Sequence, residues 1–69
     1  MNRESVTSSN LSSIGYDSAT QTLEVEFSNG AVYQYFDVPS TVHEELMNAG
    51  SHGSYLNQSI KGSYRYARV

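Results

Sequence analysis

Residues 23–35 read LEVEFSNGAVYQY, and this stretch decides the fold. Over residues 23–27 apolar side chains alternate with two glutamates, which is the period-two pattern of a half-buried strand. The Ser-Asn-Gly segment at 28–30 is a hairpin signal, and the Tyr-Gln-Tyr segment at 33–35 continues the returning strand. The sequence therefore predicts an antiparallel hairpin in the middle of the chain.

The length of the hairpin loop decides which face of the sheet receives the two tyrosines. A two-residue Asn29-Gly30 turn places Tyr33 and Tyr35 on the outer face, opposite the glutamates. A three-residue loop turns both rings toward the apolar face and leaves Gln34 outside, because a shift of one residue exchanges the faces. The longer loop is favoured, since burying Gln34 without a partner costs roughly 1–3 kcal/mol. Gly30 then takes the left-handed position of a bulge.

Elements on both sides of the hairpin complete an α+β domain. A short strand is expected over residues 10–16, helices over residues 40–49 and 51–61, and a last strand over residues 64–69. The predicted fold is a three-stranded antiparallel meander with two short helices packed on one face. A C-terminal strand returns to the sheet, and strong twist favours curling toward a partly open barrel.

Polar side chains mark the expected beginnings of both helices. Thr41, followed by Glu44, has the spacing of a capping box, and Ser40 is a competing cap. Ser51 or Ser54 is expected to cap the second helix.

The length and composition limit the chain to one small domain. It has 69 residues and no cysteine, which excludes a disulfide framework and a thiolate zinc site. Residues 1–9 are polar and serine-rich and are expected to be a flexible N-terminus, with residues 10–69 forming a single domain. Neither a signal peptide nor an apolar run of membrane-spanning length is visible, so a cytoplasmic location is expected.

The charge is unevenly distributed along the sequence. A net charge of −3 opposes general affinity for nucleic acid, which works by neutralising phosphates. Lys61, Arg65 and Arg68, three of the four basic residues, nevertheless fall within the last nine positions. The sequence predicts a small positive end of the molecule, although a solvated final strand explains these residues equally well.

Two groups of residues are candidate binding sites. The tyrosine pairs at 33–35 and 64–66 are either a stacking platform for unpaired bases or part of the core face of the sheet. The Gly-Ser-His-Gly-Ser segment at 50–54 is either an anion site before a helix or a tight turn that needs glycine.

The histidines do not predict catalysis or metal binding. His43 and His52 lie nine positions apart among scattered acids, which matches no recognised ligand spacing. The neighbouring Ser51 and His52 cannot readily form the nucleophile–base bond of a triad with Asp37. We therefore expect no enzyme activity, no catalytic residue, no metal and no cofactor.

The order and spacing of these motifs resemble those of the KTSC domain family over residues 6–68. The resemblance implies a short bacterial domain that occurs alone or at the C-terminus of some lysyl-tRNA synthetases. Its function is unknown, RNA binding has been suggested from that association, and no catalytic or ligand residue can be carried over. The matching residues are Ser12, Ser13, Ile14, Gly15, Tyr16, Leu23, Val25, Phe27, Gly30, Tyr33, Gln34, Tyr35, Val38, Pro39, Leu46, Ala49, Ser51, His52, Gly53, Asn57, Ile60 and Tyr64.

The resulting functional hypothesis is a non-catalytic interaction module that recognises RNA or a partner protein. The alternative is a structural or assembly role through protein–protein contacts or homodimerisation, with the chain a monomer or a weak homodimer. No membrane partner is expected. The candidate binding residues are Tyr33, Tyr35, Ser51, His52, Gly53, Lys61, Tyr64, Arg65 and Arg68.

Overall fold

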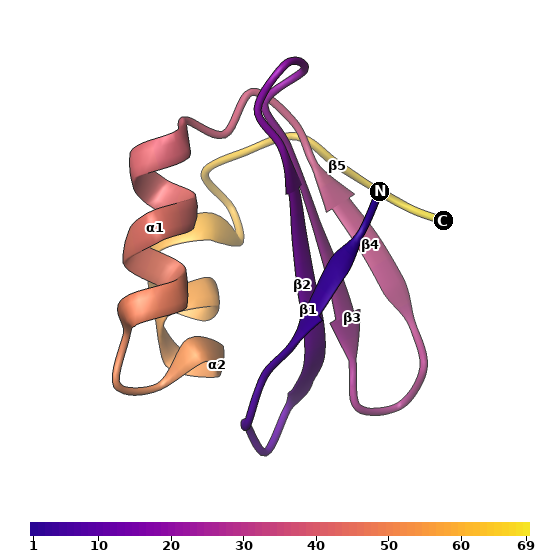
Figure 1. The fold of residues 1–69 in the computed structure, drawn as a ribbon, viewed down its shortest axis with the longest axis vertical. Helices are drawn as coiled ribbons and strands as arrows, with labels where there is room; N and C mark the ends of the chain where they lie inside the picture. The colour runs from indigo at the N-terminus through magenta and orange to yellow at the C-terminus, as the bar shows by residue number, and fades with distance from the viewer.

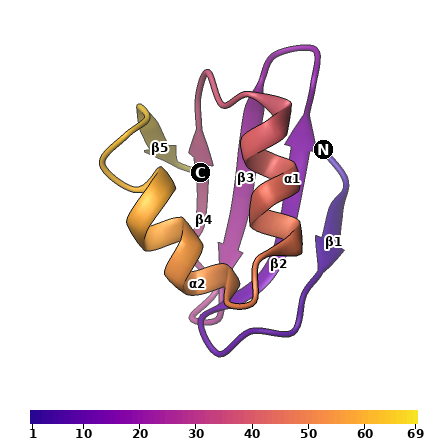
Figure 2. The ribbon, with the colours of Figure 1, turned by 90° about the vertical axis from the view of Figure 1, so that its left-hand side faces the viewer.

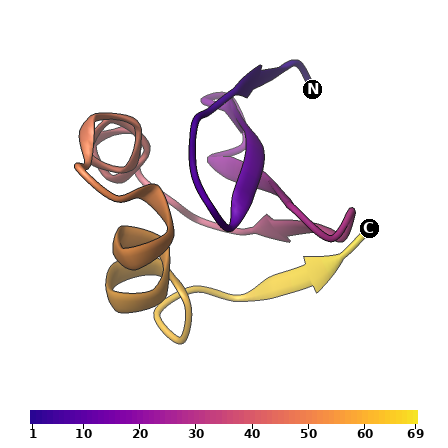
Figure 3. The same cartoon turned by 90° about the horizontal axis from the view of Figure 1, so that it is seen from below.

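Five antiparallel strands form one sheet whose spatial order follows the sequence (Figure 1). The computed structural model describes residues 1–69. The strands are β1 (Arg3–Ser5), β2 (Leu11–Asp17), β3 (Thr22–Phe27), β4 (Val32–Tyr35) and β5 (Tyr66–Arg68). β1 and β5 are the two edges and do not pair with each other, so the sheet is curved but open (Figure 3).

Two helical segments cover one face of this sheet (Figure 2). α1 (Ser40–Asn48) follows β4, and α2 (His52–Tyr55) runs directly into a π-helical turn, η1 (Leu56–Ile60). The chain then returns to pair β5 with β4. The predicted meander, two helices and returning strand are therefore present, and β1 adds an edge that was not expected. None of these helices is long and apolar enough to cross a membrane.

The central hairpin has the three-residue loop that the sequence favours. Leu23 pairs with Tyr35, and Val25 pairs with Tyr33. Gly30 has φ of 91°, which is the left-handed conformation that glycine adopts at little cost. The prediction that this register turns Tyr35 toward the core is confirmed, because only 3% of that residue is exposed.

The core lies between the helices and the inner face of β2, β3 and β4. Leu46 of α1 and Leu56 and Ile60 of η1 meet strand side chains there. The two η1 residues are four positions apart and lie on one side of the helix. Nine residues form this cluster: Leu11, Ile14, Leu23, Val25, Tyr35, Val38, Leu46, Leu56 and Ile60.

The beginning of α1 differs from the prediction. The helix begins at Ser40 with Pro39 at the cap position, and no side chain caps it. The prediction of a capping box from Thr41 to Glu44 is wrong, because Thr41 already lies inside the first turn of the helix. The Ser51 cap of α2 is confirmed, since its hydroxyl accepts a hydrogen bond from the backbone N–H of Ser54 at 3.3 Å.

The sequence did not predict β1, which lies within the polar segment 1–9. Its three residues are exposed, so no apolar alternation marks them as a strand. Arg3 pairs with Gly15 of β2, where a Cβ atom would lie 2.7 Å from the backbone oxygen of Asn2. The glycine therefore allows the edge strand to approach. The flexibility of residues 1–9 stays a prediction.

Replacing Gly15 with alanine is expected to separate β1 from the sheet, because the clashing oxygen belongs to the backbone and cannot rotate away. We expect the free energy of unfolding to fall by about 1–3 kcal/mol and the β1 amides to exchange faster with solvent. Hydrogen exchange and urea unfolding measure both effects. Gly50→Ala is the control, since its Cβ atom meets nothing within 4 Å.

Candidate functional site

A groove opens between the central hairpin, β5 and the end of η1. We call it the aromatic groove and define it by Phe27, Tyr33, Tyr35, Lys61, Tyr66 and Arg68. Its volume is about 590 Å³. The residues come from β3, β4, β5 and the residue that follows η1, so the pairing of β5 with β4 assembles the groove.

Four aromatic rings follow one another along this groove. The ring centroids of Phe27 and Tyr33 lie 5.6 Å apart in an edge-to-face arrangement. The ring of Tyr66 lies 5.9 Å from those of both Tyr33 and Tyr35. Tyr66 is 62% exposed, whereas Tyr35 is buried and Tyr33 is half-buried. Tyr66 therefore offers the accessible ring, and the less exposed rings of Tyr33 and Tyr35 pack against it.

The buried phenol of this cluster stays neutral at physiological pH. Burial raises the pKa of Tyr35, and the neighbouring Tyr33 and Tyr66 phenols raise it further. The hydroxyl group therefore keeps its proton and can donate a hydrogen bond.

The four basic residues divide into two paired and two unpaired side chains. Arg3 forms an ion pair with Glu24 at 2.6 Å, and Arg65 forms one with Asp37 at 2.8 Å. Lys61 and Arg68 form no ion pair. These two unpaired cations both line the aromatic groove.

The walls of the groove carry no carboxylate group. None of the seven Asp and Glu residues lines it. The ammonium group of Lys61 lies 5.0 Å from the centroid of the Phe27 ring, which is cation–π geometry. The groove is therefore locally positive on a molecule whose net charge is −3.

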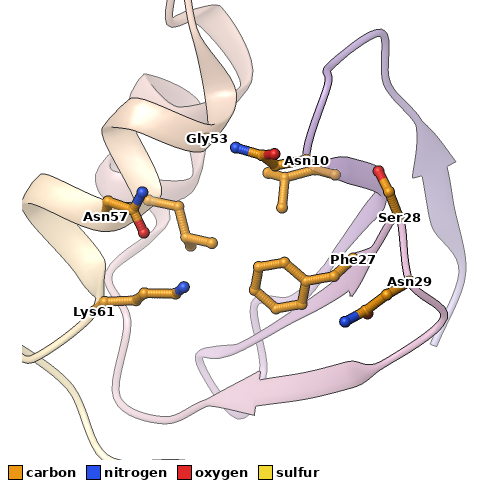
Figure 4. Close-up of a pocket in the computed structure, with 9 residues that line it drawn as sticks. Asn10, Phe27, Ser28, Asn29, Gly53, Asn57 and Lys61 are labelled. Carbon is orange, nitrogen blue, oxygen red and sulfur yellow. The ribbon is translucent and has the colours of Figure 1, made fainter.

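A second cavity of about 300 Å³ adjoins the aromatic groove and shares Phe27, Asn29 and Lys61 with it. We call it the amide pocket, because Asn10, Asn29 and Asn57 lie around it (Figure 4). Figure 4 shows Lys61 extending from the helical side toward the ring of Phe27.

The other face of the sheet holds a polar network that ties β1 to the hairpin. Arg3 donates to Ser13 at 2.9 Å and to Glu24, and Gln34 donates to Glu24 at 2.9 Å. Ser13 donates in turn to Glu26 at 2.9 Å. The prediction that Gln34 lies beside Glu24, away from the core, is confirmed.

The pKa of Glu24 is held below its ordinary value, chiefly by the hydrogen bond from Gln34 and further by Arg3. A carboxyl group whose pKa is lower in the folded state stabilises the fold above its unfolded pKa. That stabilisation disappears as the pH falls through the folded pKa.

Glu24→Gln is therefore expected to flatten the loss of stability that begins at about pH 5 and continues as the pH falls through the lowered pKa of Glu24. Urea unfolding at a series of pH values measures this dependence. Glu44→Gln is the control, because Glu44 is exposed and forms no ion pair. An unchanged pH dependence in Glu24→Gln would contradict the account of the network.

The structure brings together four of the sequence-predicted site residues: Tyr33, Tyr35, Lys61 and Arg68. Tyr64 and Arg65 instead line an adjoining open hollow with Phe36, which shares Gly62 and Tyr66 with the aromatic groove. The guanidinium of Arg65 lies 5.6 Å from the Phe36 ring and is paired with a carboxylate.

The segment 50–54 is largely occupied by structural contacts. The hydroxyl of Ser51 caps α2, and Nδ1 of His52 donates to the carbonyl of Leu46 at 2.8 Å, since a carbonyl can only accept. Gly53 is buried and borders the amide pocket. The remaining histidine, His43, stacks on the ring of Tyr16 at 4.7 Å.

Tyr66, the most exposed ring of the groove, belongs to the tyrosine pair at 64–66 but is not among the individual candidate binding residues. The echo of Tyr33-Gln34-Tyr35 in Tyr64-Arg65-Tyr66 was visible in the sequence. Only the pairing of β5 with β4 shows that Tyr66 stands opposite Tyr35.

Comparison with known proteins gives a consistent result. Residues 7–64 match the KTSC domain. An uncharacterized protein of Stutzerimonas stutzeri is 49% identical over the whole chain and 99% of its own length. A crystal structure of a KTSC domain protein from Yersinia pestis is 38% identical, with a TM-score of 0.94 over 99% of this chain and 96% of that one.

A longer relative is the lysine–tRNA ligase of Trichormus variabilis. It is 54% identical over 54 residues, which cover 78% of this chain. The chain spans only 10% of the length of that ligase. The matched residues include both the hairpin and the helical segments, and the chain belongs to the KTSC domain family.

Proposed function

We propose that this protein is a non-catalytic module that binds single-stranded RNA in the aromatic groove. The observation that carries the proposal is the meeting of an exposed ring, Tyr66, with two unpaired cations, Lys61 and Arg68, in a groove without carboxylates. In such a groove the ring of Tyr66 can stack on a base, and the cations can contact the phosphate of the same nucleotide.

Stacking of a base on an aromatic ring contributes about 1–3 kcal/mol, and basic side chains neutralise the phosphates between the bases. An unpaired base can reach the ring of Tyr66, whereas the bases of a duplex are stacked on one another. The groove therefore suits single strands better than duplexes.

The similarity to lysine–tRNA ligases supports an RNA partner, since those enzymes are named for a tRNA substrate. It also supports a cytoplasmic location as part of the same proposal.

The proposal is tested by fluorescence anisotropy with a labelled RNA hexanucleotide and with a duplex of the same sequence. We expect the single strand to bind more tightly than the duplex. Tyr66→Ala is expected to weaken single-strand binding by about 5- to 150-fold, because it removes the stacking ring. Tyr66→Phe keeps the ring and should bind nearly as the native protein does. Equal affinity of the native protein and Tyr66→Ala would contradict the proposal.

The competing function is assembly through a homodimer. Tyr66 and Val69 are exposed apolar residues at the β5 edge, which is an unpaired edge strand. Light scattering over a range of concentrations distinguishes the two functions. Suppose that the native protein has the mass of a dimer and binds no RNA, and that Tyr66→Ala has the mass of a monomer. This result would assign the groove to a second copy of the chain.

A further inference from the structure

We infer that the amide pocket receives one unpaired nucleobase and reads its edge, which gives the groove a base preference. This inference rests on the proposed function, because the pocket continues the groove that holds the strand.

The pocket has the dimensions and lining of a small-ligand site. Its volume is about 300 Å³. Among the apolar lining residues, Leu11 and Leu56 are only 1% exposed and form the floor, so the half-buried ring of Phe27 offers the face for a planar ring. Polar groups stand around it. Sites with apolar walls and a few polar groups orient small ligands in this way. No carboxylate lines the pocket.

The asparagine side chains keep unused hydrogen-bonding groups. The side-chain oxygen of Asn29 accepts from the backbone N–H of Ala31 at 3.0 Å, which leaves its amide hydrogens available. Asn10 and Asn57 are exposed, and their side-chain amides form no hydrogen bond with another protein group. The amides of Asn10 and Asn57 each offer a donor beside an acceptor, which is the pattern that pairs with the edge of a base, and Asn29 adds a donor.

Gly53 keeps the pocket open, and Lys61 connects it to the groove in which the RNA strand would lie. A Cβ atom at Gly53 would lie 3.2 Å from the side-chain nitrogen of Asn10, so the glycine leaves room for that amide. Lys61 stands above the Phe27 ring where pocket and groove meet (Figure 4). There it can neutralise the phosphate between a base in the pocket and a base on Tyr66.

The first test compares Asn57→Ala with Gln58→Ala, which alters an exposed neighbour that does not line the pocket. Affinities for oligoadenylate, oligocytidylate and oligouridylate hexamers are measured over a series of salt concentrations. The native protein is expected to prefer one hexamer by about tenfold. Asn57→Ala should reduce that preference without changing the salt dependence, because it removes a base contact and no phosphate contact. Gln58→Ala should behave as the native protein does.

A second measurement observes the pocket directly. The side-chain amide signals of Asn10, Asn29 and Asn57 are followed by NMR while nucleoside monophosphates or ribose 5-phosphate are added to the native protein. We expect shifts with the nucleotides and none with the sugar phosphate.

Equal affinity for the three hexamers, together with equal shifts from both ligands, would overturn the inference and leave the proposed function in place. The absence of any RNA binding by the native protein would remove both.

Discussion

Replacing Leu46 with alanine is expected to lower the free energy of unfolding by about 2–5 kcal/mol. Leu46 is fully buried and is the only buried residue of α1, so its side chain holds the helix against the sheet. A domain of 69 residues has a total stability of about 3–10 kcal/mol, and this change removes much of it. Urea unfolding followed by circular dichroism measures the loss.

Met47→Ala is the matched control, because Met47 is the next residue of α1 and is only half-buried. We expect its cost to be clearly smaller than that of Leu46→Ala. Equal costs for the two variants would show that α1 does not dock through Leu46.

The central hairpin was predictable because three local signals agree there. The alternating residues 23–27 define the two faces of the strand, and the loop must then have the length that leaves Gln34 on the polar face. Gly30 supplies the positive φ that a three-residue loop requires. The apolar spacing of Leu56 and Ile60 similarly identified the second helix.

Other elements depend on contacts that are distant in the sequence. β1 exists because Gly15 leaves room for it and because Arg3 reaches across β2 to the carboxylate of Glu24 in β3. The π-helical turn η1 closes with a hydrogen bond from the N–H of Lys61 to the carbonyl of Leu56. Neither contact produces a periodic pattern in the local sequence.

The candidate site was predictable only in part. The tyrosine pairs and the basic C-terminal segment indicated the residue types. The predicted residues Tyr33, Tyr35, Lys61 and Arg68 line one groove only because β5 pairs with β4. Local spacing gave no reason to separate Arg65 from Arg68. The structure separates them, because Arg65 is paired with Asp37 and Arg68 is not.

Replacing both Lys61 and Arg68 with methionine is expected to weaken the binding of single-stranded RNA by at least about tenfold at low salt. Methionine keeps an unbranched side chain of similar length, so the loss reports the charge. Both side chains are exposed and form no ion pair, so we expect the stability of the fold to change little. Anisotropy titrations measure the affinity, and urea unfolding checks the stability.

Arg65→Met is the matched control for this double variant. It removes a nearby cation that forms an exposed ion pair with Asp37 and that does not line the aromatic groove. An equal loss of affinity in Arg65→Met would indicate a general charge effect and contradict the assignment of the groove.

In the proposed function, the unpaired cations Lys61 and Arg68 hold a nucleic-acid backbone along the aromatic groove. The most direct test is the salt dependence of RNA affinity, measured from about 50 to about 300 mM monovalent salt for the native protein and the double variant. With two phosphate contacts we expect log affinity to fall against log salt with a slope of about −1.4, and the slope should approach zero in the double variant. An affinity that is independent of salt, or a slope that both proteins share, would contradict the account.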